Sequence, residues 1–185
     1  TYGAFRAGAV VVMNNPLYTD RELEHQYNDS GSKFLVCLDL LAPRMINLRQ
    51  KTGITKIISC HIRDFLPFPL KQLFPFVKKD MHRKTPAAPD VFEFMDLIGK
   101  YGPIIDPPRL EWESTAVLLY TGGTTGVSKG VELTQANLSC NVQQCAAWFP
   151  DFEPGGEVVV GCLPFFHSFG MTTAMNIGIF HGYAD

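Results

Sequence analysis

The chain has 185 residues, of which 46% are apolar and 18% are charged, with a formal net charge of −2. This length allows one or at most two domains with a buried core, and the composition is that of a globular protein. The small net charge gives no support for a disordered charged tail or a nucleic-acid partner.

The distribution of apolar residues and cysteines bears on where the protein is located in the cell. No stretch reaches the roughly 18 to 20 apolar residues that a membrane-spanning helix requires. The five cysteines lack the paired spacing of zinc or redox motifs, which indicates reduced, mostly buried thiols. We therefore expect a cytoplasmic protein that is soluble or peripheral to a membrane.

Strand and helix patterns alternate along the chain. The predicted strands are residues 10–13, 34–38, 56–60, 116–120 and 158–163. The predicted helices are the end of one at residues 2–9, then residues 19–31, 40–49 and 134–148. Thr19 with Glu22 forms a capping-box pattern, and Thr134 is a typical N-cap. Short strands that alternate with helices predict an α/β fold with layered parallel or mixed sheets flanked by helices.

We predict that the chain forms two lobes. Residues 1–150 form a first α/β lobe that contains an irregular, proline-rich excursion at residues 65–108, and residues 157–185 begin a second lobe. Within the excursion, residues 65–84 combine phenylalanines and prolines with lysines and arginine. That composition is typical of an interfacial membrane contact, although aromatic loops also pack on their own domain.

Residues 120–130, YTGGTTGVSKG, directly follow a predicted strand. Glycines let backbone N–H groups approach an anion, threonine hydroxyls donate to phosphate oxygens, and lysine adds a positive charge. The segment is not a Walker loop, because Ser128 precedes Lys129 and Gly130 follows it, and it lacks the G-x-G-x-x-G spacing. A glycine-rich hairpin turn with residues 130–133 as the returning strand is the alternative interpretation.

Residues 121–130, followed by Val131, Leu133, Thr134, Asn137 and Leu138, resemble the signature loop of adenylate-forming enzymes. This superfamily comprises acyl-CoA ligases, luciferases and peptide-synthetase adenylation domains. The resemblance implies a truncated N-terminal domain whose loop holds the ATP phosphates, with Lys129 as a catalytic residue and Thr125 as a contact of Mg²⁺. The implied phosphate-binding residues are Thr121, Gly122, Gly123, Thr124, Thr125, Gly126 and Lys129. Gly122, where the family often has serine, favours long-chain fatty-acid-CoA ligases of the bacterial type.

Residues 163–171, LPFFHSFGM, resemble the next motif of the same superfamily, which borders the acyl pocket near the α-phosphate. The resemblance implies a catalytic role for His167, which could respond to the charge developing on the phosphate. The implied substrate pocket contains His167, Ser168, Phe169 and Gly170. The remaining histidines, His25, His61, His82 and His181, carry no functional prediction.

The resemblance implies an ATP-dependent acyl-CoA ligase that joins a fatty acid to coenzyme A through an acyl-adenylate, with Mg²⁺ as cofactor. Because the adenine, ribose, magnesium-glutamate and C-terminal lysine sites of the family lie beyond residue 185, we expect this chain to be inactive alone. Another adenylate-forming enzyme, such as an aryl-CoA ligase or a luciferase-like enzyme, is one alternative. A non-catalytic nucleotide- or membrane-binding module is another. The acyl chain length and the formation of a homodimer are left open.

Overall fold

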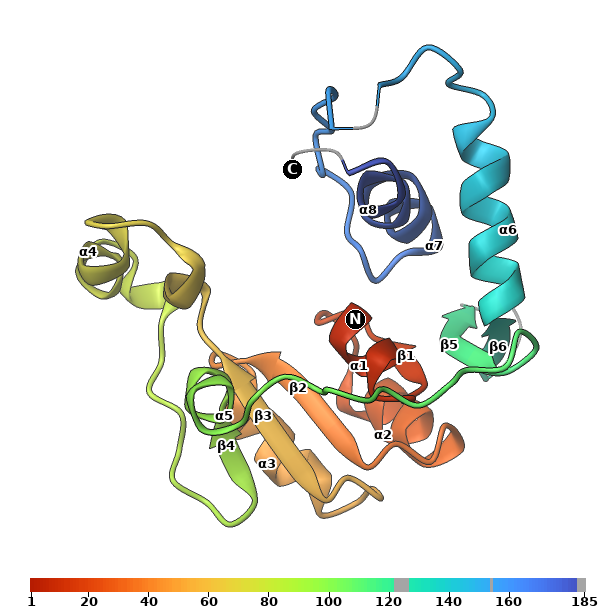
Figure 1. Ribbon diagram of the computed structural model, residues 1–185. Coiled ribbons are helices and arrows are strands. Elements are labelled where there is room, and N and C mark those ends of the chain that lie inside the picture. The colour runs from red at the N-terminus through yellow and green to blue at the C-terminus, as the bar shows by residue number, and fades with distance from the viewer. Residues whose placement is uncertain (122–126, 154, 183–185) are drawn as a thin grey trace. The chain divides into compact units, whose positions relative to one another are not determined.

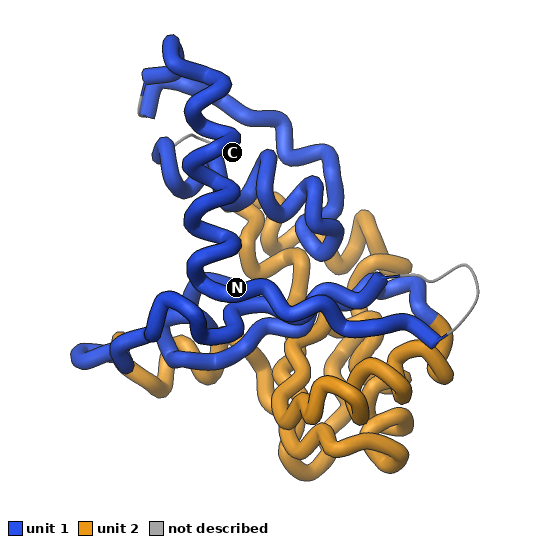
Figure 2. Tube along the Cα trace, turned by 90° about the vertical axis from the view of Figure 1, so that its right-hand side faces the viewer, with its two compact units in different colours: residues 1–18, 104–185 blue, residues 19–103 orange. Residues whose placement is uncertain are grey.

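The computed structural model describes residues 1–121, 127–153 and 155–182 (Figure 1). The chain forms two compact units, one of residues 1–18 with 104–185 and one of residues 19–103 (Figure 2). Each unit contains a three-stranded sheet with helices, which confirms the predicted α/β class. The predicted lobe boundary between residues 150 and 157 stays a prediction.

The first unit is built on a mixed sheet of order β1-β5-β6, in which β1 is parallel to β5 and β6 is antiparallel to it. The strands are β1 Val11–Met13, β5 Thr115–Thr121 and β6 Lys129–Thr134. The helices are α1 Tyr2–Arg6, α6 Gln135–Ala146, α7 Ser168–Gly170, the π-helical turn Met171–Asn176 and α8 Ile177–His181.

The core of this unit forms around β5. Ala116 and Val117 are fully buried and pack with Met171, which is 2% exposed. The register of β5 with β6 shifts between Thr115 and Val117, and such a bulge interrupts the strict alternation of side chains at Ala116, so that both neighbours can join one core cluster. The partly buried side chains around them are Phe5, Val11, Met13, Leu119, Leu133, Leu138 and Met175.

The second unit is built on a parallel sheet of order β2-β3-β4. The strands are β2 Phe34–Leu38, β3 Lys56–Cys60 and β4 Val91–Glu93. The helices are α2 Asp20–Asp29, α3 Ala42–Arg49, α4 Leu70–Val77 and α5 Phe94–Lys100, with 3-10 turns at Ile62–Phe65 and Lys79–Met81. The core side chains include Leu23, Tyr27, Met45, Leu48 and Ile57.

Both predicted helix caps are present. The Thr19 hydroxyl accepts from the Glu22 backbone N–H at 3.4 Å, and the Glu22 carboxylate accepts from the Thr19 N–H at 2.7 Å. At α6, Thr134 Oγ1 accepts from the Asn137 N–H at 3.1 Å and Asn137 Oδ1 accepts from the Thr134 N–H at 3.0 Å. The strands predicted at residues 34–38 and 56–60 have the predicted bounds.

The strand predicted at residues 158–163 is wrong. Apart from an isolated bridge at Val158, this segment forms no ladder, and Val158 and Val160 are 75% and 80% exposed. A β-branched run favours a strand only where it can pack on a pleated, half-buried surface. In the described parts of the chain no neighbouring strand supplies that surface, so propensity alone does not fix the conformation.

Two other expectations need correction. Residues 65–108 are not irregular throughout, because they contain α4, β4 and α5, and Pro75 is accommodated inside the short α4. The cysteines are all free as expected, but the prediction that most are buried is wrong, because Cys37, Cys60 and Cys145 are only partly buried and Cys140 and Cys162 are exposed. Cys140 lies two positions before the buried Val142 of α6, and residues two apart on a helix do not share a face.

Among the described residues, no helix has both the length and the apolar character that crossing a membrane requires.

Replacing Thr134 by alanine is expected to lower the free energy of unfolding by about 0.5–2 kcal/mol, because α6 loses the side-chain acceptor at its N-terminus. Urea unfolding of the purified protein measures the effect. Thr134→Ser, which retains the hydroxyl, serves as the control and should lie close to the wild type. Equal losses in the two variants would contradict the assignment of the effect to the cap.

Candidate active site

The predicted phosphate loop connects β5 to β6. These strands pair antiparallel, with Tyr120 opposite Gly130 and Thr121 opposite Lys129. Five predicted phosphate-binding residues lie outside the described residues: Gly122, Gly123, Thr124, Thr125 and Gly126. The hairpin interpretation is therefore right for the flanking strands. It does not compete with an anion-binding loop, because a hairpin connection can also present backbone N–H groups to a phosphate.

The two described residues of this set face each other across the base of the loop. Thr121 ends β5, and Lys129 begins β6 with an exposed side chain. Within the described ranges Lys129 forms no ion pair, so its ammonium is available to an anion. Gly130 allows the Tyr120 ring to lie across β6, since an added Cβ would be 3.0 Å from the ring carbon Cζ. A hydroxyl and an ammonium at this position fit the triphosphate of a nucleotide.

His167 is positioned by the helix that follows it. It is the N-cap of α7, and its Nδ1 accepts a hydrogen bond from the Phe169 backbone N–H at 3.3 Å. A ring nitrogen that accepts carries no proton, so in the neutral imidazole the proton resides on Nε2. The exposed His167 can therefore donate from Nε2 to an oxygen of a ligand.

The segment that carries His167 is anchored to the same core as the loop. Gly170 is buried, and a Cβ added there would lie 2.5 Å from the Pro164 carbonyl oxygen. Met171 next to it packs on Ala116 and Val117 of β5. The strand β5, which leads into the loop, thus also anchors the C-terminal end of the segment 163–171 that carries His167.

The predicted pocket residues form one continuous turn but no closed pocket within the described part of the chain. Ser168 is exposed and Phe169 is 59% exposed, whereas Gly170 is buried. No hydrogen bond or ion pair joins His167 to Thr121 or Lys129 among the described residues. The structure thus organises the site as two elements attached to one strand, and their catalytic roles stay predictions.

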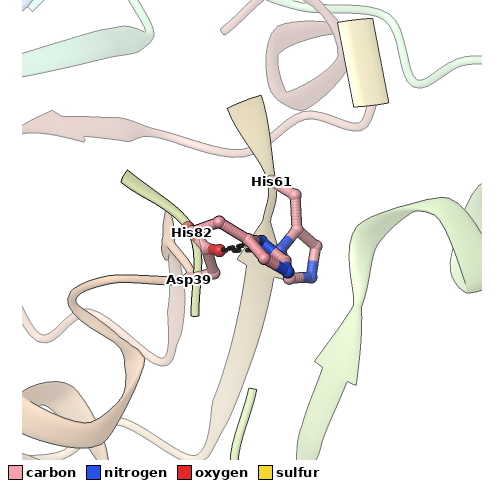
Figure 3. Close-up of side chains that lie close together, drawn as sticks. All are labelled: Asp39, His61 and His82. Carbon is pink, nitrogen blue, oxygen red and sulfur yellow. Dashed lines mark hydrogen bonds and ion pairs between the residues drawn. The ribbon is translucent and has the colours of Figure 1, made fainter. Parts of the chain in front are cut away.

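The second unit contains a polar cluster that the sequence analysis did not predict. Asp39 is fully buried, and its Oδ2 lies 2.8 Å from His61 Nδ1 and 3.2 Å from His82 Nδ1 (Figure 3). The Arg83 backbone N–H donates to the same oxygen at 2.8 Å, and the Leu40 N–H donates to Oδ1 at 3.0 Å. Burial alone would raise the pKa of Asp39, but the hydrogen bonds from Arg83, His61 and Leu40 and the attraction of His61 hold it below its ordinary value.

No local sequence motif predicts this cluster, because Asp39, His61 and His82 come from three separate segments. The available signal was topological: Asp39 and His61 each follow a predicted strand directly. The carboxyl ends of adjacent parallel strands lie at one edge of a sheet, so polar residues at those positions meet.

Comparison with protein families gives one match that covers the described site. The model for AMP-binding enzymes ("AMP-binding: AMP-binding enzyme") matches residues 1–184. Nearly the entire chain, including both site segments, is thus described by that family. The chain belongs to the AMP-binding enzyme family.

Curated relatives and solved structures agree with this assignment. The chain is 38% identical over 185 residues to a long-chain-fatty-acid-CoA ligase of Bacillus subtilis strain 168, covering 98% of this chain and 33% of the relative. It is 40% identical over 175 residues to the ligase of that name from Escherichia coli O157:H7, covering 92% and 31%. A crystal structure of a long-chain-fatty-acid-CoA ligase from Archaeoglobus fulgidus aligns with a TM-score of 0.72 at 27% identity, covering 98% and 31%. The chain therefore spans about a third of the length of these relatives.

Gly170→Ala is expected to lower the free energy of unfolding by about 1–3 kcal/mol, because the new methyl group meets the Pro164 and Leu163 carbonyl oxygens. Gly99→Ala in α5 is the matched control, since a Cβ there meets no atom within 4 Å and alanine favours a helix. Urea unfolding of both variants compares them. A Gly170→Ala protein as stable as the wild type would show that residues 163–170 are not held as described.

Proposed function

We propose that the complete protein carrying this chain is a cytoplasmic, ATP-dependent long-chain fatty-acid-CoA ligase. The observation that carries the proposal is the placement of Thr121 opposite Lys129 at the base of the β5-β6 loop, in a chain 38% to 40% identical to two bacterial long-chain-fatty-acid-CoA ligases. In the first half-reaction a carboxylate oxygen attacks the α-phosphorus of ATP, and pyrophosphate leaves. In the second, the thiolate sulfur of coenzyme A attacks the acyl carbon, and AMP leaves.

The loop serves the first half-reaction. The β- and γ-phosphates gain negative charge as pyrophosphate departs, and the exposed ammonium of Lys129 stabilises that charge. The Thr121 hydroxyl is the proposed donor to a phosphate oxygen. Mg²⁺ bound to the triphosphate would neutralise further charge, and Thr125 is its proposed protein contact. Gly122, Gly123, Thr124 and Gly126 complete the proposed phosphate site.

His167 is the proposed contact between the loop chemistry and the acyl group. Its Nδ1 is occupied by the Phe169 N–H, so its Nε2–H is free to donate to the carboxylate or to an α-phosphate oxygen. Such a donor orients the nucleophile and stabilises charge on the phosphate. Ser168, Phe169 and Gly170 are the proposed wall beside the reacting carboxylate, and the exposed Phe169 ring suits an aliphatic chain.

A different acid substrate is the main competing proposal. The chain is also 29% identical over 164 residues to the 4-coumarate-CoA ligase-like 8 protein of Arabidopsis thaliana. An aryl-CoA ligase or a luciferase-like enzyme would use the same phosphate loop with a different acyl pocket. The exchange assay below separates these proposals by the acid on which activity depends.

Pyrophosphate exchange by the complete enzyme is expected to require a long-chain fatty acid and to fall by roughly 100-fold or more in Lys129→Ala, because stabilisation of the leaving group is lost. Thr124→Ala and His167→Ala should also lower it. Isotope exchange between pyrophosphate and ATP, with fatty and aromatic acids supplied in turn, is the measurement. Lys51→Ala, an exposed lysine elsewhere on the chain, controls for loss of charge. Exchange that depends only on an aromatic acid would favour the alternative, and wild-type exchange in Lys129→Ala would remove the loop from the mechanism.

The α4 region favours a peripheral membrane contact as a second property of the protein. Phe65, Phe68, Phe76 and Val77 are 69%, 83%, 74% and 72% exposed. Residues 65–84 also contain five basic residues and one acidic residue, which gives this short segment a net positive charge. Exposed aromatic rings beside lysines match the chemistry of an anionic lipid interface.

Phe76→Ser and Phe68→Ser are each expected to reduce co-sedimentation with vesicles of phosphatidylcholine and phosphatidylglycerol, because each removes an exposed ring from the proposed contact. Added salt should also weaken binding by screening the basic residues. Leu17→Ser removes an apolar side chain that is 86% exposed outside this segment and should bind like the wild type. Binding that Phe76→Ser and Leu17→Ser affect equally would exclude residues 65–84 as the contact surface.

A further inference from the structure

The parallel sheet of the second unit collects polar side chains at one edge. Asp39 follows β2 directly, His61 follows β3 directly, and Glu93 is the last residue of β4. Leu38 is in register with Cys60, and the Asp39 N–H donates to the Cys60 carbonyl at 2.9 Å. Three neighbouring strands therefore each contribute one side chain at their carboxyl ends, the edge at which α/β sheets bind ligands.

His82 completes the group from outside the sheet. It follows the 3-10 turn Lys79–Met81, and its ring lies 5.3 Å from the His61 ring between centroids. Figure 3 shows Asp39, His61 and His82 turned toward one another. One potential ligand atom from each lies within 4.8 Å of the others. Zinc bonds of about 2.0–2.2 Å in a tetrahedron place neighbouring ligand atoms roughly 3.3–3.6 Å apart. The present separations of 2.8 and 3.2 Å from Asp39 Oδ2 are close to this range, and the three ligand atoms all lie within 4.8 Å of one another.

The surroundings of the cluster orient these ligands. Glu93 Oε2 lies 2.9 Å from His61 Nε2, the ring nitrogen opposite the one that faces Asp39. A carboxylate on the outer nitrogen is the usual partner of a metal-ligating histidine, because it fixes the ring and the tautomer. The backbone N–H groups of Leu40 and Arg83 fix the Asp39 carboxylate in the same way.

Burial and charge distinguish this cluster from a surface group of polar residues. The side chains of Asp39 and His61 are 1% and 8% exposed, whereas His82 is 20% exposed and offers a route from solvent. In the described part of the chain, the only ion-pairing partners of the buried Asp39 are the two histidines. Buried carboxylates are stabilised by a nearby positive charge, and a divalent ion between imidazole and carboxylate ligands would supply it in place of a protonated histidine.

We propose that Asp39, His61 and His82 bind one divalent transition-metal ion of the zinc type, with Glu93 supporting His61 from outside the coordination sphere. Two imidazoles and one carboxylate suit zinc and leave a fourth position for water. The ion would tie the edge of the β2-β3-β4 sheet to the segment that carries His82. The site lies outside the segments proposed to bind ATP and the acyl group, so the test of its occupancy does not depend on the proposed ligase activity.

Titration of the chelator-treated, purified protein with Zn²⁺ by calorimetry tests the site. One ion is expected to bind at this cluster, with affinity reduced about 10- to 100-fold in Glu93→Gln through loss of the supporting carboxylate. His82→Gln, at the outer and partly exposed ligand, should reduce affinity at least as much while leaving the circular dichroism unchanged. His25→Gln removes a histidine of the same unit outside the cluster and should bind like the wild type. Heat unfolding should show stabilisation by Zn²⁺ in the wild type but not in His82→Gln.

The absorption spectrum of the Co²⁺-loaded protein distinguishes metal bound at this site from metal bound by the exposed thiols of Cys140 and Cys162. A site of nitrogen and oxygen ligands gives visible d–d absorption without the near-ultraviolet charge-transfer band of cobalt thiolates. A thiolate band, wild-type affinity in His82→Gln, or no Zn²⁺ uptake by the folded protein would each overturn the proposal. In the last case the cluster is a hydrogen-bonded network that holds the sheet edge without an ion.

Discussion

The pairing of β5 on both of its edges is the constraint on which the first unit depends. The strand binds β1 in parallel and β6 in antiparallel register, and its Ala116 and Val117 are fully buried. A central strand held in this way cannot shift by one residue without moving its buried side chains to the wrong face. The positions of Thr121 and Lys129 at the base of the loop follow from that fixed register.

The same strand links the two halves of the candidate active site. Met171 packs on β5, and Gly170 brings the turn at residues 163–170 close against its own backbone. His167 is thereby held at the start of α7, where its Nδ1 accepts from the Phe169 backbone N–H and its Nε2 is left to donate. A rigid scaffold with exposed polar groups at its loops is the usual arrangement for binding and catalysis. Membership in the AMP-binding enzyme family supports the proposal that this arrangement binds the phosphates of ATP.

In the second unit, too, strand pairing determines which polar side chains come together. Parallel strands bring Asp39, His61 and Glu93 to one edge, although up to 54 positions separate them in the sequence. Burial makes the interactions among these groups strong, because a polar group removed from water must find a partner in the protein. The two units therefore differ in kind. The first unit exposes Thr121, Lys129 and His167, whereas the second unit buries Asp39 and His61 in a compact cluster.

Features that depend on near neighbours could be predicted from the amino-acid sequence. The capping residues Thr19 and Thr134, the strands at residues 34–38 and 56–60, and the resemblance carried by residues 121–130 all rest on interactions within a few positions or on a continuous motif. The pairing of the strands, the absence of a ladder at residues 158–163 and the contact of Asp39 with His61 and His82 became clear only from the folded chain. Pairing and burial depend on partners that are distant in the sequence, and local propensity does not encode those partners.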